Sequence, residues 1–236
     1  MAAEQAEIAL GRLAGRYGLS TRQREQLAAL LTALEHDERA PTSVRRAEQA
    51  VHVHLADSLV ALELEVVRGA RTIADLGAGA GFPGLALAVA LPESEVRLVE
   101  SQARKCAFIA EIVAQVGLGN ARVVCARAEE WHDGTAEHDL VTARALAPQA
   151  VVLEYASPLL RVGGSLVDWR GRRVAEEEDA ASRAAEELGL RRAQVRRVEP
   201  FAGARDHHLH VFSKVEETPE RFPRRAGVAR KRPLGA

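Results

Sequence analysis

The sequence predicts an α/β fold with a mostly parallel seven-stranded sheet, preceded by a helical N-terminal extension. Two observations carry this prediction. From residue 69 onward, short apolar runs alternate with longer amphipathic stretches, which is typical of strand–helix units. A glycine-rich turn follows the first of these runs, as in nucleotide-binding sheets. The 236 residues fit one α/β domain of roughly 250 residues, which we divide into 1–68, 69–216 and 217–236.

Composition excludes several classes of protein. With 47% hydrophobic and 28% charged residues, the chain is neither disordered nor fibrous. The N-terminus has no basic segment before an apolar one, and the longest apolar run is seven residues, whereas a membrane span needs about 20. The two cysteines, Cys106 and Cys125, predict neither a disulfide framework nor a metal cluster, and we expect both in the core. We therefore expect a cytoplasmic protein, by default a monomer.

The N-terminal extension, residues 1–68, has helical periodicity. Four leucines recur at the spacing i, i+3, i+4, i+7: Leu27, Leu30, Leu31 and Leu34. Ser20 or Thr21 can cap this helix, and Pro41 interrupts the pattern. A second helical stretch runs from about residue 46 to 67, and Gly69 ends it.

The next part of the chain alternates strands and helices. The predicted strands are residues 72–76, 95–100, 121–126, 140–143, 165–169, 191–198 and 208–214. The predicted helices between them are residues 83–90, 103–116, 148–160 and 174–188. No helix separates the last two strands, and Pro200 and Gly203 indicate a hairpin-like connection there. We therefore expect one antiparallel strand at that end of the sheet.

The C-terminal tail, residues 217–236, is basic, whereas the rest of the chain is acidic. From residue 221 onward there are no acids, and residues 1–220 carry a net charge of −7. The tail cations are Arg221, Arg224, Arg225, Arg230, Lys231 and Arg232. This asymmetry predicts a polyanionic partner, although a disordered, solvated tail has the same composition.

The most informative motif is the turn after the first predicted strand, D-L-G-A-G-A-G-F-P-G at residues 75–84. Gly77, Gly79 and Gly81 allow close approach of a ligand to the backbone, and Pro83 suits the first position of a helix. The N–H groups at that helix start would face the ligand. NAD, FAD and S-adenosylmethionine sites all contain such a turn, and a tight turn without a ligand is the alternative.

Two carboxylates favour S-adenosylmethionine. Asp75 precedes Gly77 by two residues and suits the ammonium group of an amino-acid ligand better than a pyrophosphate. Glu100 lies 23 residues after Gly77, near the ~20 expected for a carboxylate that binds ribose hydroxyls. A dehydrogenase would also need a catalytic domain or a Tyr/Lys or His pair, and we can place none.

Two further turns supply candidate residues. Ala128 and Glu129 follow the third strand, where they would hold an adenine, or where the loop is merely solvated. Arg144 follows the fourth strand and would point into the crevice at the carboxyl edge of the sheet. There it could bind a carboxylate or a substrate phosphate, or form a surface salt bridge.

The residues constrain the chemistry. The fourth-strand turn lacks the Asn/Asp-Pro-Pro-aromatic motif of base amino-group methylation, and neither cysteine is placed as a nucleophile. Methylation of a ring nitrogen with a free lone pair, such as guanine N7, needs mainly alignment and desolvation. His52 and His54 would not share a helix face. His207, His208 and His210 admit a metal site, but we interpret them as solvated strand residues.

The motifs together resemble a known family. They are H-L-A-D-S-L at 54–59, D-L-G-A-G-A-G-F-P-G-L at 75–85, L-V-E-S at 98–101, R-A-E-E at 127–130, T-A-R-A at 142–145 and F-P-R-R-A-G at 222–227. In this order they resemble the bacterial small-subunit rRNA guanine-N7 methyltransferases, RsmG or GidB, over roughly residues 53–233. Two stretches depart from the family: 38–43, which would be an aromatic and Asn-containing segment, and Trp169-Arg170-Gly171, which is often Leu-Lys-Gly.

The resemblance implies a class I S-adenosylmethionine-dependent methyltransferase (Rossmann-like) fold. It implies methyl transfer to N7 of guanine 527 in 16S rRNA of the 30S subunit, with no metal. By motif, the cofactor contacts would be Gly77, Phe82, Ala128, Glu129 and Arg144, and we treat Arg144 as the catalytic candidate. Lys105 and the basic tail are candidate rRNA contacts, so deleting the tail should leave cofactor affinity unchanged. The alternatives are a nucleotide-binding RNA chaperone or regulatory module without catalysis, and a small-molecule methyltransferase, which has no use for a basic tail.

Overall fold

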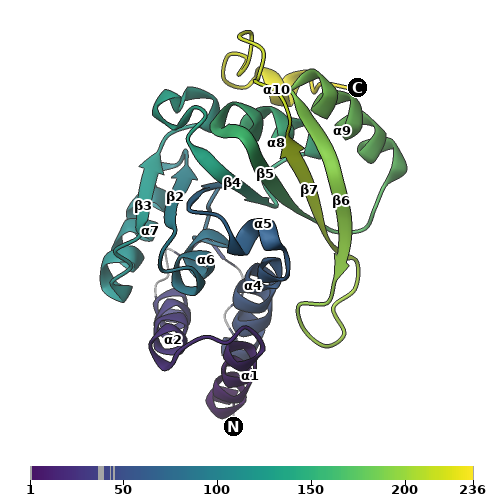
Figure 1. The fold of residues 1–236 in the computed structure, drawn as a ribbon. Coiled ribbons are helices and arrows are strands. Elements are labelled where there is room, and N and C mark those ends of the chain that lie inside the picture. The colour runs from purple at the N-terminus through teal and green to yellow at the C-terminus, as the bar shows by residue number, and fades with distance from the viewer. Residues whose placement is uncertain (1, 37–39, 43, 45, 236) are drawn as a thin grey trace.

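The computed structural model describes residues 2–36, 40–42, 44 and 46–235, whose centre is a seven-stranded sheet of order β3-β2-β1-β4-β5-β7-β6 (Figure 1). The strands are β1 (Thr72–Leu76), β2 (Glu95–Glu100), β3 (Ala121–Cys125), β4 (His138–Arg144), β5 (Leu160–Arg170), β6 (Leu190–Val198) and β7 (His207–Lys214). β1 to β5 are parallel, and β7 pairs antiparallel with β5 and β6. The predicted mostly parallel sheet with one antiparallel strand is therefore confirmed.

The register brings the carboxyl ends of the strands to one edge of the sheet. Leu76 at the end of β1 pairs with Val99 on one side and Ala143 on the other. Glu100 pairs with Cys125, and Arg144 pairs with Trp169. The turns that follow β1, β2, β3 and β4 therefore lie next to one another, where open α/β sheets bind ligands.

Helices cover both faces of the sheet. The elements are α6 (Gly84–Ala90) and α7 (Ala103–Val116) on one face, and α8 (Gln149–Ala156) and α9 (Ala175–Glu187) on the other. Leu85 and Phe108 fill the first core layer, and Leu153 and Ala184 belong to the second. The apolar strands are buried on both sides, as parallel sheets require.

The N-terminal extension packs into the first of these layers. Its helices are α1 (Ala2–Arg16) and α2 (Thr21–His36), followed by α3 (Ala47–Ala50), a π-helical turn η1 (Val51–Ala56), α4 (Asp57–Leu59), η2 (Val60–Glu63) and α5 (Glu65–Arg68). Ser20 caps α2, because its Oγ accepts from the N–H of Gln23 while Gln23 Oε1 accepts from the N–H of Ser20. Leu27, Leu30 and Leu34 join the same core cluster as Leu85.

The structure corrects the predictions for the cysteines. Cys106 on α7 and Cys125 at the end of β3 form a disulfide with Cα atoms 5.7 Å apart. Cys106 is buried, but Cys125 is exposed. Because Glu100 and Cys125 are register partners, α7, which begins just after Glu100, passes directly beside the end of β3.

The prediction for His210 is wrong as well. His210 is buried and neither ring nitrogen has a hydrogen-bond partner, so it is not solvated. It lies on the face covered by α9, where burial lowers its pKa to about 4. His208 lies on the same side, with ring centroids 6.5 Å apart. Among the described residues, no three His, Cys, Asp or Glu side chains gather in a way that could hold a metal ion.

Candidate functional site

A cavity of about 520 Å³ opens at the carboxyl edge of β1 to β4. Its walls include Gly77 of the glycine turn, residues 99–102 at the end of β2 and just after it, residues 126–129 after β3 and residues 145–146 after β4. The structure thus brings Gly77, Glu100, Ala128 and Glu129 together, although they are spread over more than fifty positions of the chain. The sequence predicted these four residues, but not the whole wall.

The conformation of the glycine turn depends on left-handed φ angles at its glycines and on hydrogen bonds to β2. Gly77, Gly79 and Gly81 have φ of 66°, 60° and 98°. The N–H groups of Gly77 and Ala78 both donate to the carbonyl of Val99, at 2.9 and 3.1 Å. These bonds fasten the turn to the end of β2, where the cavity begins.

Glu100 is held in one orientation beside this turn. Its side chain is buried, Oε2 accepts from the N–H of Gly79 at 3.1 Å, and Oε1 accepts from the N–H of Gln102 at 2.9 Å. Two backbone donors fix the carboxylate at the cavity wall, and the Ser101 hydroxyl also donates to Oε1 at 3.4 Å, so it is Oε2 that keeps a lone pair for a ligand hydroxyl. This is the placement that a ribose-binding carboxylate needs.

Asp75 lies behind the turn. It is fully buried, Oδ2 accepts from the N–H of Gly84 at 2.9 Å, and Oδ1 accepts from the hydroxyl of Thr142 at 2.9 Å. A Cβ on Gly84 would lie 2.7 Å from Oδ2, so only glycine fits there. Burial raises the pKa of Asp75 to about 6, although the two hydrogen bonds act to lower it. Asp75 thus joins β1, β4 and the start of α6, and it is not one of the residues lining the cavity.

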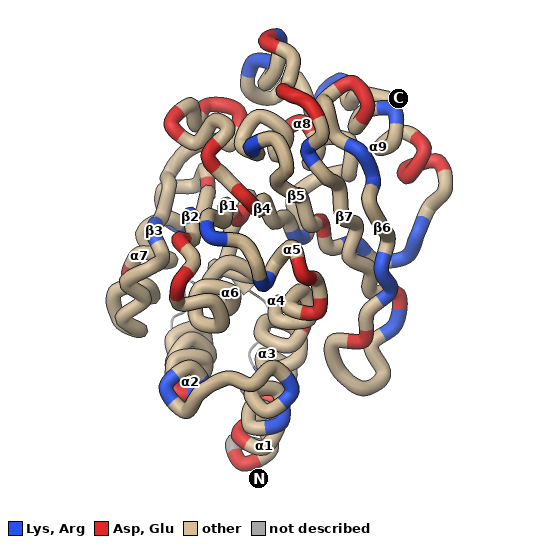
Figure 2. The backbone as a smooth tube through the Cα atoms, viewed as in Figure 1, with Lys and Arg blue, Asp and Glu red and all other residues tan. Residues whose placement is uncertain are grey.

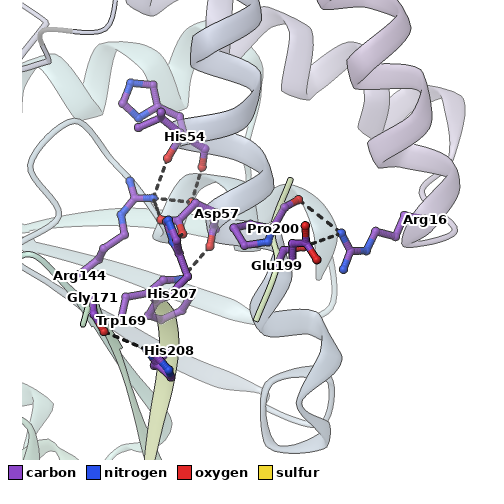
Figure 3. Close-up of polar contacts among 12 residues, drawn as sticks. Arg16, His54, Asp57, Arg144, Trp169, Gly171, Glu199, Pro200, His207 and His208 are labelled. Carbon is purple, nitrogen blue, oxygen red and sulfur yellow. Dashed lines mark hydrogen bonds and ion pairs between the residues drawn. The ribbon is translucent and has the colours of Figure 1, made fainter. Parts of the chain in front are cut away.

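Phe82 and Arg144 turn toward the N-terminal extension. Figure 3 shows Arg144, Asp57 and His207 gathered below His54. Arg144 donates to Asp57 Oδ2 at 2.8 Å and to the carbonyl of Val53 at 3.0 Å. Both charged side chains of this pair are largely buried, so the contact is not the surface salt bridge that we considered.

Asp57 connects three strands to the extension. His207 Nδ1 of β7 lies 3.0 Å from Asp57 Oδ1, and Trp169 Nε1 of β5 donates to the carbonyl of Asp57 at 2.7 Å (Figure 3). The ring of His54 stacks on Phe82 at 5.0 Å, and burial lowers its pKa to about 4. The motif H-L-A-D-S-L and the G-F-P turn are therefore in direct contact, beside the cavity.

The divergent stretch 38–43 is described in part. Thr42 Oγ1 lies 3.0 Å from His54 Nε2, and Ala40 is buried. Glu38, Arg39 and Ser43 lie outside the described residues. Lys105, which we expected to contact rRNA, lines the cavity from the first turn of α7.

The basic tail is folded, which contradicts the disordered alternative. Phe222 is buried, and the Arg224 Nε donates to Glu154 Oε1 of α8 at 2.8 Å. A short helix, α10 (Val228–Lys231), follows, and Arg230 lines the cavity. Gly227 donates its N–H to Glu129 Oε1 at 3.1 Å.

Sequence reasoning missed several residues of the cavity wall, among them Leu146, Tyr155 and Arg230. Burial raises the pKa of Tyr155, and the nearby Glu129 raises it further, whereas Arg230 lowers it. Arg230 donates to the carbonyl of Leu146 at 3.1 Å. No local pattern marks Tyr155 and Arg230, because α8 and α10 bring them to the cavity from later in the chain, whereas Leu146 lies two residues after the predicted Arg144.

Comparison with known proteins places the chain among methyltransferases. Residues 22–208 match the family described as GidB, rRNA small subunit methyltransferase G. The chain is 38% identical over 183 residues to the ribosomal RNA small subunit methyltransferase G of Syntrophomonas wolfei, covering 77% of this chain and 85% of that one. With the protein of the same name from Thermotoga neapolitana it is 37% identical, covering 82% and 83%.

Solved structures show the same fold at low sequence identity. A SAM-dependent methyltransferase from Aquifex aeolicus superposes with a TM-score of 0.55 at 16% identity, covering 71% of this chain and 93% of that one. The mitomycin 7-O-methyltransferase MmcR superposes with a TM-score of 0.57 at 13% identity, covering 87% and 72%. The strand order and these likenesses establish the class I methyltransferase fold.

Proposed function

The chain belongs to the GidB family of rRNA small subunit methyltransferases G, S-adenosylmethionine-dependent enzymes that act on guanine N7 of 16S rRNA, and we propose that its target is guanine 527 of the 30S subunit. The observation that carries the proposal is the cavity at the carboxyl edge of the sheet. There the glycine turn and the fixed carboxylate of Glu100 meet the turns after β3 and β4.

We assign the cofactor to this cavity. Gly77 lines the cavity and the Cβ position of Gly79 is open, whereas those of Gly77 and Gly81 are filled by the side chains of Leu146 and Leu85. In this assignment Glu100 accepts from a ribose hydroxyl. Ala128 and Glu129 form the wall at the end of the cavity that we assign to the adenine. Asp75 contributes by holding the turn against β4 and α6, since it is fully buried behind the turn and does not line the cavity.

The reaction needs little acid–base chemistry from the protein. When bound, S-adenosylmethionine supplies an electrophilic methyl group that the lone pair of guanine N7 can attack directly. No proton leaves N7, so the protein's task is to align and desolvate the reactants. Arg144 contributes by fixing the extension, through Asp57, beside the turn that carries Phe82.

Two surfaces suit an rRNA partner. Figure 2 shows basic residues on several elements, with arginines along β6 as well as near the C-terminus. Within the tail, Arg221 pairs with Glu187 and Arg224 pairs with Glu154, whereas the exposed Arg225, Lys231 and Arg232 pair with no carboxylate of the described residues and do not line the cavity. We propose that these last three residues contact rRNA phosphates. We further propose that the enzyme is a monomer and acts in the cytoplasm. No helix in the described part of the chain is long and apolar enough to cross a membrane.

Methyl transfer to 30S subunits that lack 16S N7 methylation tests the proposal. Radiolabelled S-adenosylmethionine should label one guanine, and mapping the nucleotide identifies the position. Arg144→Ala should lower turnover with the same substrate. Label at a different guanine would overturn the assigned position. No label on RNA, with calorimetric binding of S-adenosylmethionine intact, would favour the non-catalytic RNA chaperone or a small-molecule substrate.

A further inference from the structure

The C-terminal segment, residues 217–235, has a fixed position against the second face of the sheet. Phe222 and Ala229 are buried in the core layer formed by α8 and α9. Arg224 makes an ion pair with Glu154 of α8, whose side chain is only 1% exposed. Figure 1 shows α10 beside α8, at the end of the molecule away from α1 and α2.

Two residues of this segment reach the cavity. The N–H of Gly227 donates to Glu129 Oε1 at 3.1 Å, and Glu129 is itself part of the cavity wall. Arg230 lines the cavity directly and donates to the carbonyl of Leu146 at 3.1 Å. The segment therefore connects the turn after β3 with the turn after β4.

We propose that the C-terminal segment is one wall of the cofactor site and that Arg230 is a further cofactor-binding residue, at the adenine end of the cavity. The inference rests on the proposed function, because it takes this cavity as the S-adenosylmethionine site. Adenine presents ring-nitrogen acceptors and a flat face. A guanidinium presents five N–H donors in a planar fork that also stacks on aromatic rings.

Gly227 has a supporting part in the same site. Glu129 is buried, and one of its oxygens is engaged by the Gly227 N–H. That bond orients the Glu129 carboxylate, which on this proposal would accept a hydrogen bond from the adenine amino group. The segment thus contributes one ligand contact and the alignment of another.

This arrangement couples cofactor and rRNA. Arg225, Lys231 and Arg232 are exposed on the segment whose Arg230 lines the cavity. RNA bound to the exposed cations therefore lies on the segment that carries the cofactor-binding wall, and any change that it causes in cofactor affinity is matched, by thermodynamic reciprocity, by the same factor in RNA affinity. On this proposal, deleting the tail also weakens cofactor binding, whereas our sequence-based expectation is that cofactor affinity stays unchanged.

Calorimetric titration of the full chain without RNA tests the proposal. The probes are S-adenosylhomocysteine and 5′-methylthioadenosine, which share the adenosine but not the amino-acid end. Arg230→Ala should weaken both by about tenfold, the order expected when one charged hydrogen-bonding group is removed from a site. Arg225→Ala removes an exposed cation of the same segment that does not line the cavity, and it should leave both affinities unchanged.

The outcomes separate the possibilities. Thermal unfolding of Arg230→Ala should match that of the parent, so that a change in affinity is not a change in folding. Unaltered affinity of Arg230→Ala would overturn the proposal, as would an equal loss in Arg225→Ala, which would indicate net charge alone. A loss for S-adenosylhomocysteine without one for 5′-methylthioadenosine would overturn the placement at the adenine end. A parent protein that binds neither probe would overturn the proposed function itself.

Discussion

At the scale of the residue, Asp75 and Glu100 are two buried carboxylates with different surroundings. Asp75 accepts from Gly84 and Thr142 and faces only the protein. Glu100 is oriented by Gly79 and Gln102 at the wall of the cavity. Their positions in the sequence predicted that both matter, but they could not show which one faces a ligand.

Asp75 makes stability depend on pH. Its folded-state pKa of about 6 lies above the ordinary aspartate value of 3.8, so the folded protein holds this proton more tightly than the unfolded chain. Its contribution is therefore fully present below about pH 4 and is lost as the pH rises through 6. Asp75→Asn removes this dependence, so the unfolding free energy of the variant relative to the parent should rise from pH 4 to 7, on the order of 2–3 kcal/mol.

Urea denaturation at several pH values measures this difference. Glu93→Gln, which replaces an exposed carboxyl, should show no such trend. A constant difference between the Asp75→Asn variant and the parent over this range would contradict the burial effect.

Gly79 allows a clean test of the glycine turn. Its φ is +60°, and its Cβ position meets nothing closer than the carbonyl oxygen of Gly77 at 3.6 Å. Gly203 also has a left-handed φ, with nothing within 4 Å, in the loop between β6 and β7. Alanine should cost each position a similar strain, about 1–2 kcal/mol. Only Gly79→Ala should also weaken S-adenosylmethionine binding in calorimetry, by tenfold or more; equal binding by the two variants would contradict the assignment.

At the scale of the element, the sequence predicted the central structure closely. The predicted strands 72–76 and 95–100 and the helix 103–116 coincide with β1, β2 and α7, because apolar periodicity and glycine punctuation are local signals. β5 begins at Leu160 rather than at 165, since Gly163 and Gly164 lie within the strand instead of ending it.

The parts that escaped prediction depend on distant partners. Arg144 meets Asp57 at a separation of 87 residues, and Arg224 meets Glu154 at a separation of 70. The composition of the tail is also that of a solvated segment, because no feature of the tail sequence shows that Glu154 is buried and can pair with one of its cations. Ion pairs between residues far apart in the chain produce no periodic pattern in a single sequence, so they could not be predicted from it.

The ion pair that anchors the C-terminal segment should therefore be unusually costly to break. Arg224→Ala leaves the Glu154 carboxylate buried without its partner, and we expect a loss of about 3–5 kcal/mol in unfolding free energy. Arg221→Ala removes an exposed pair with Glu187 and should cost no more than about 1 kcal/mol. Denaturation of the two variants side by side measures the difference, and similar losses would contradict the burial argument.

At the scale of the whole molecule, the N-terminal extension and the sheet share one core. Leu30 and Leu34 belong to the same cluster as Leu85 and Phe108. Arg16 of α1 also donates to the carbonyls of Glu199 and Pro200, at the far end of the chain (Figure 3). The division at residue 68 is therefore not a boundary between separate cores.

A shared core predicts a single unfolding transition. Trp131 and Trp169 report on the sheet region, whereas far-UV circular dichroism reports mainly on helices, including those of the extension. We expect the two signals to change together in denaturant. Loss of helical signal before the tryptophan signal would show that the extension unfolds on its own.

The contact between Gly227 and Glu129 spans 98 positions of the chain, and this has a consequence for biosynthesis. A ribosome completes β1 to β4, with the glycine turn and Glu100, long before it adds Arg230. A nascent chain that ends between β7 and Arg230 holds the whole sheet and most of the cavity but lacks one wall, so on this proposal it binds the cofactor weakly even when the sheet is already folded. Full affinity is acquired late in synthesis, when the last turn of helix docks against α8.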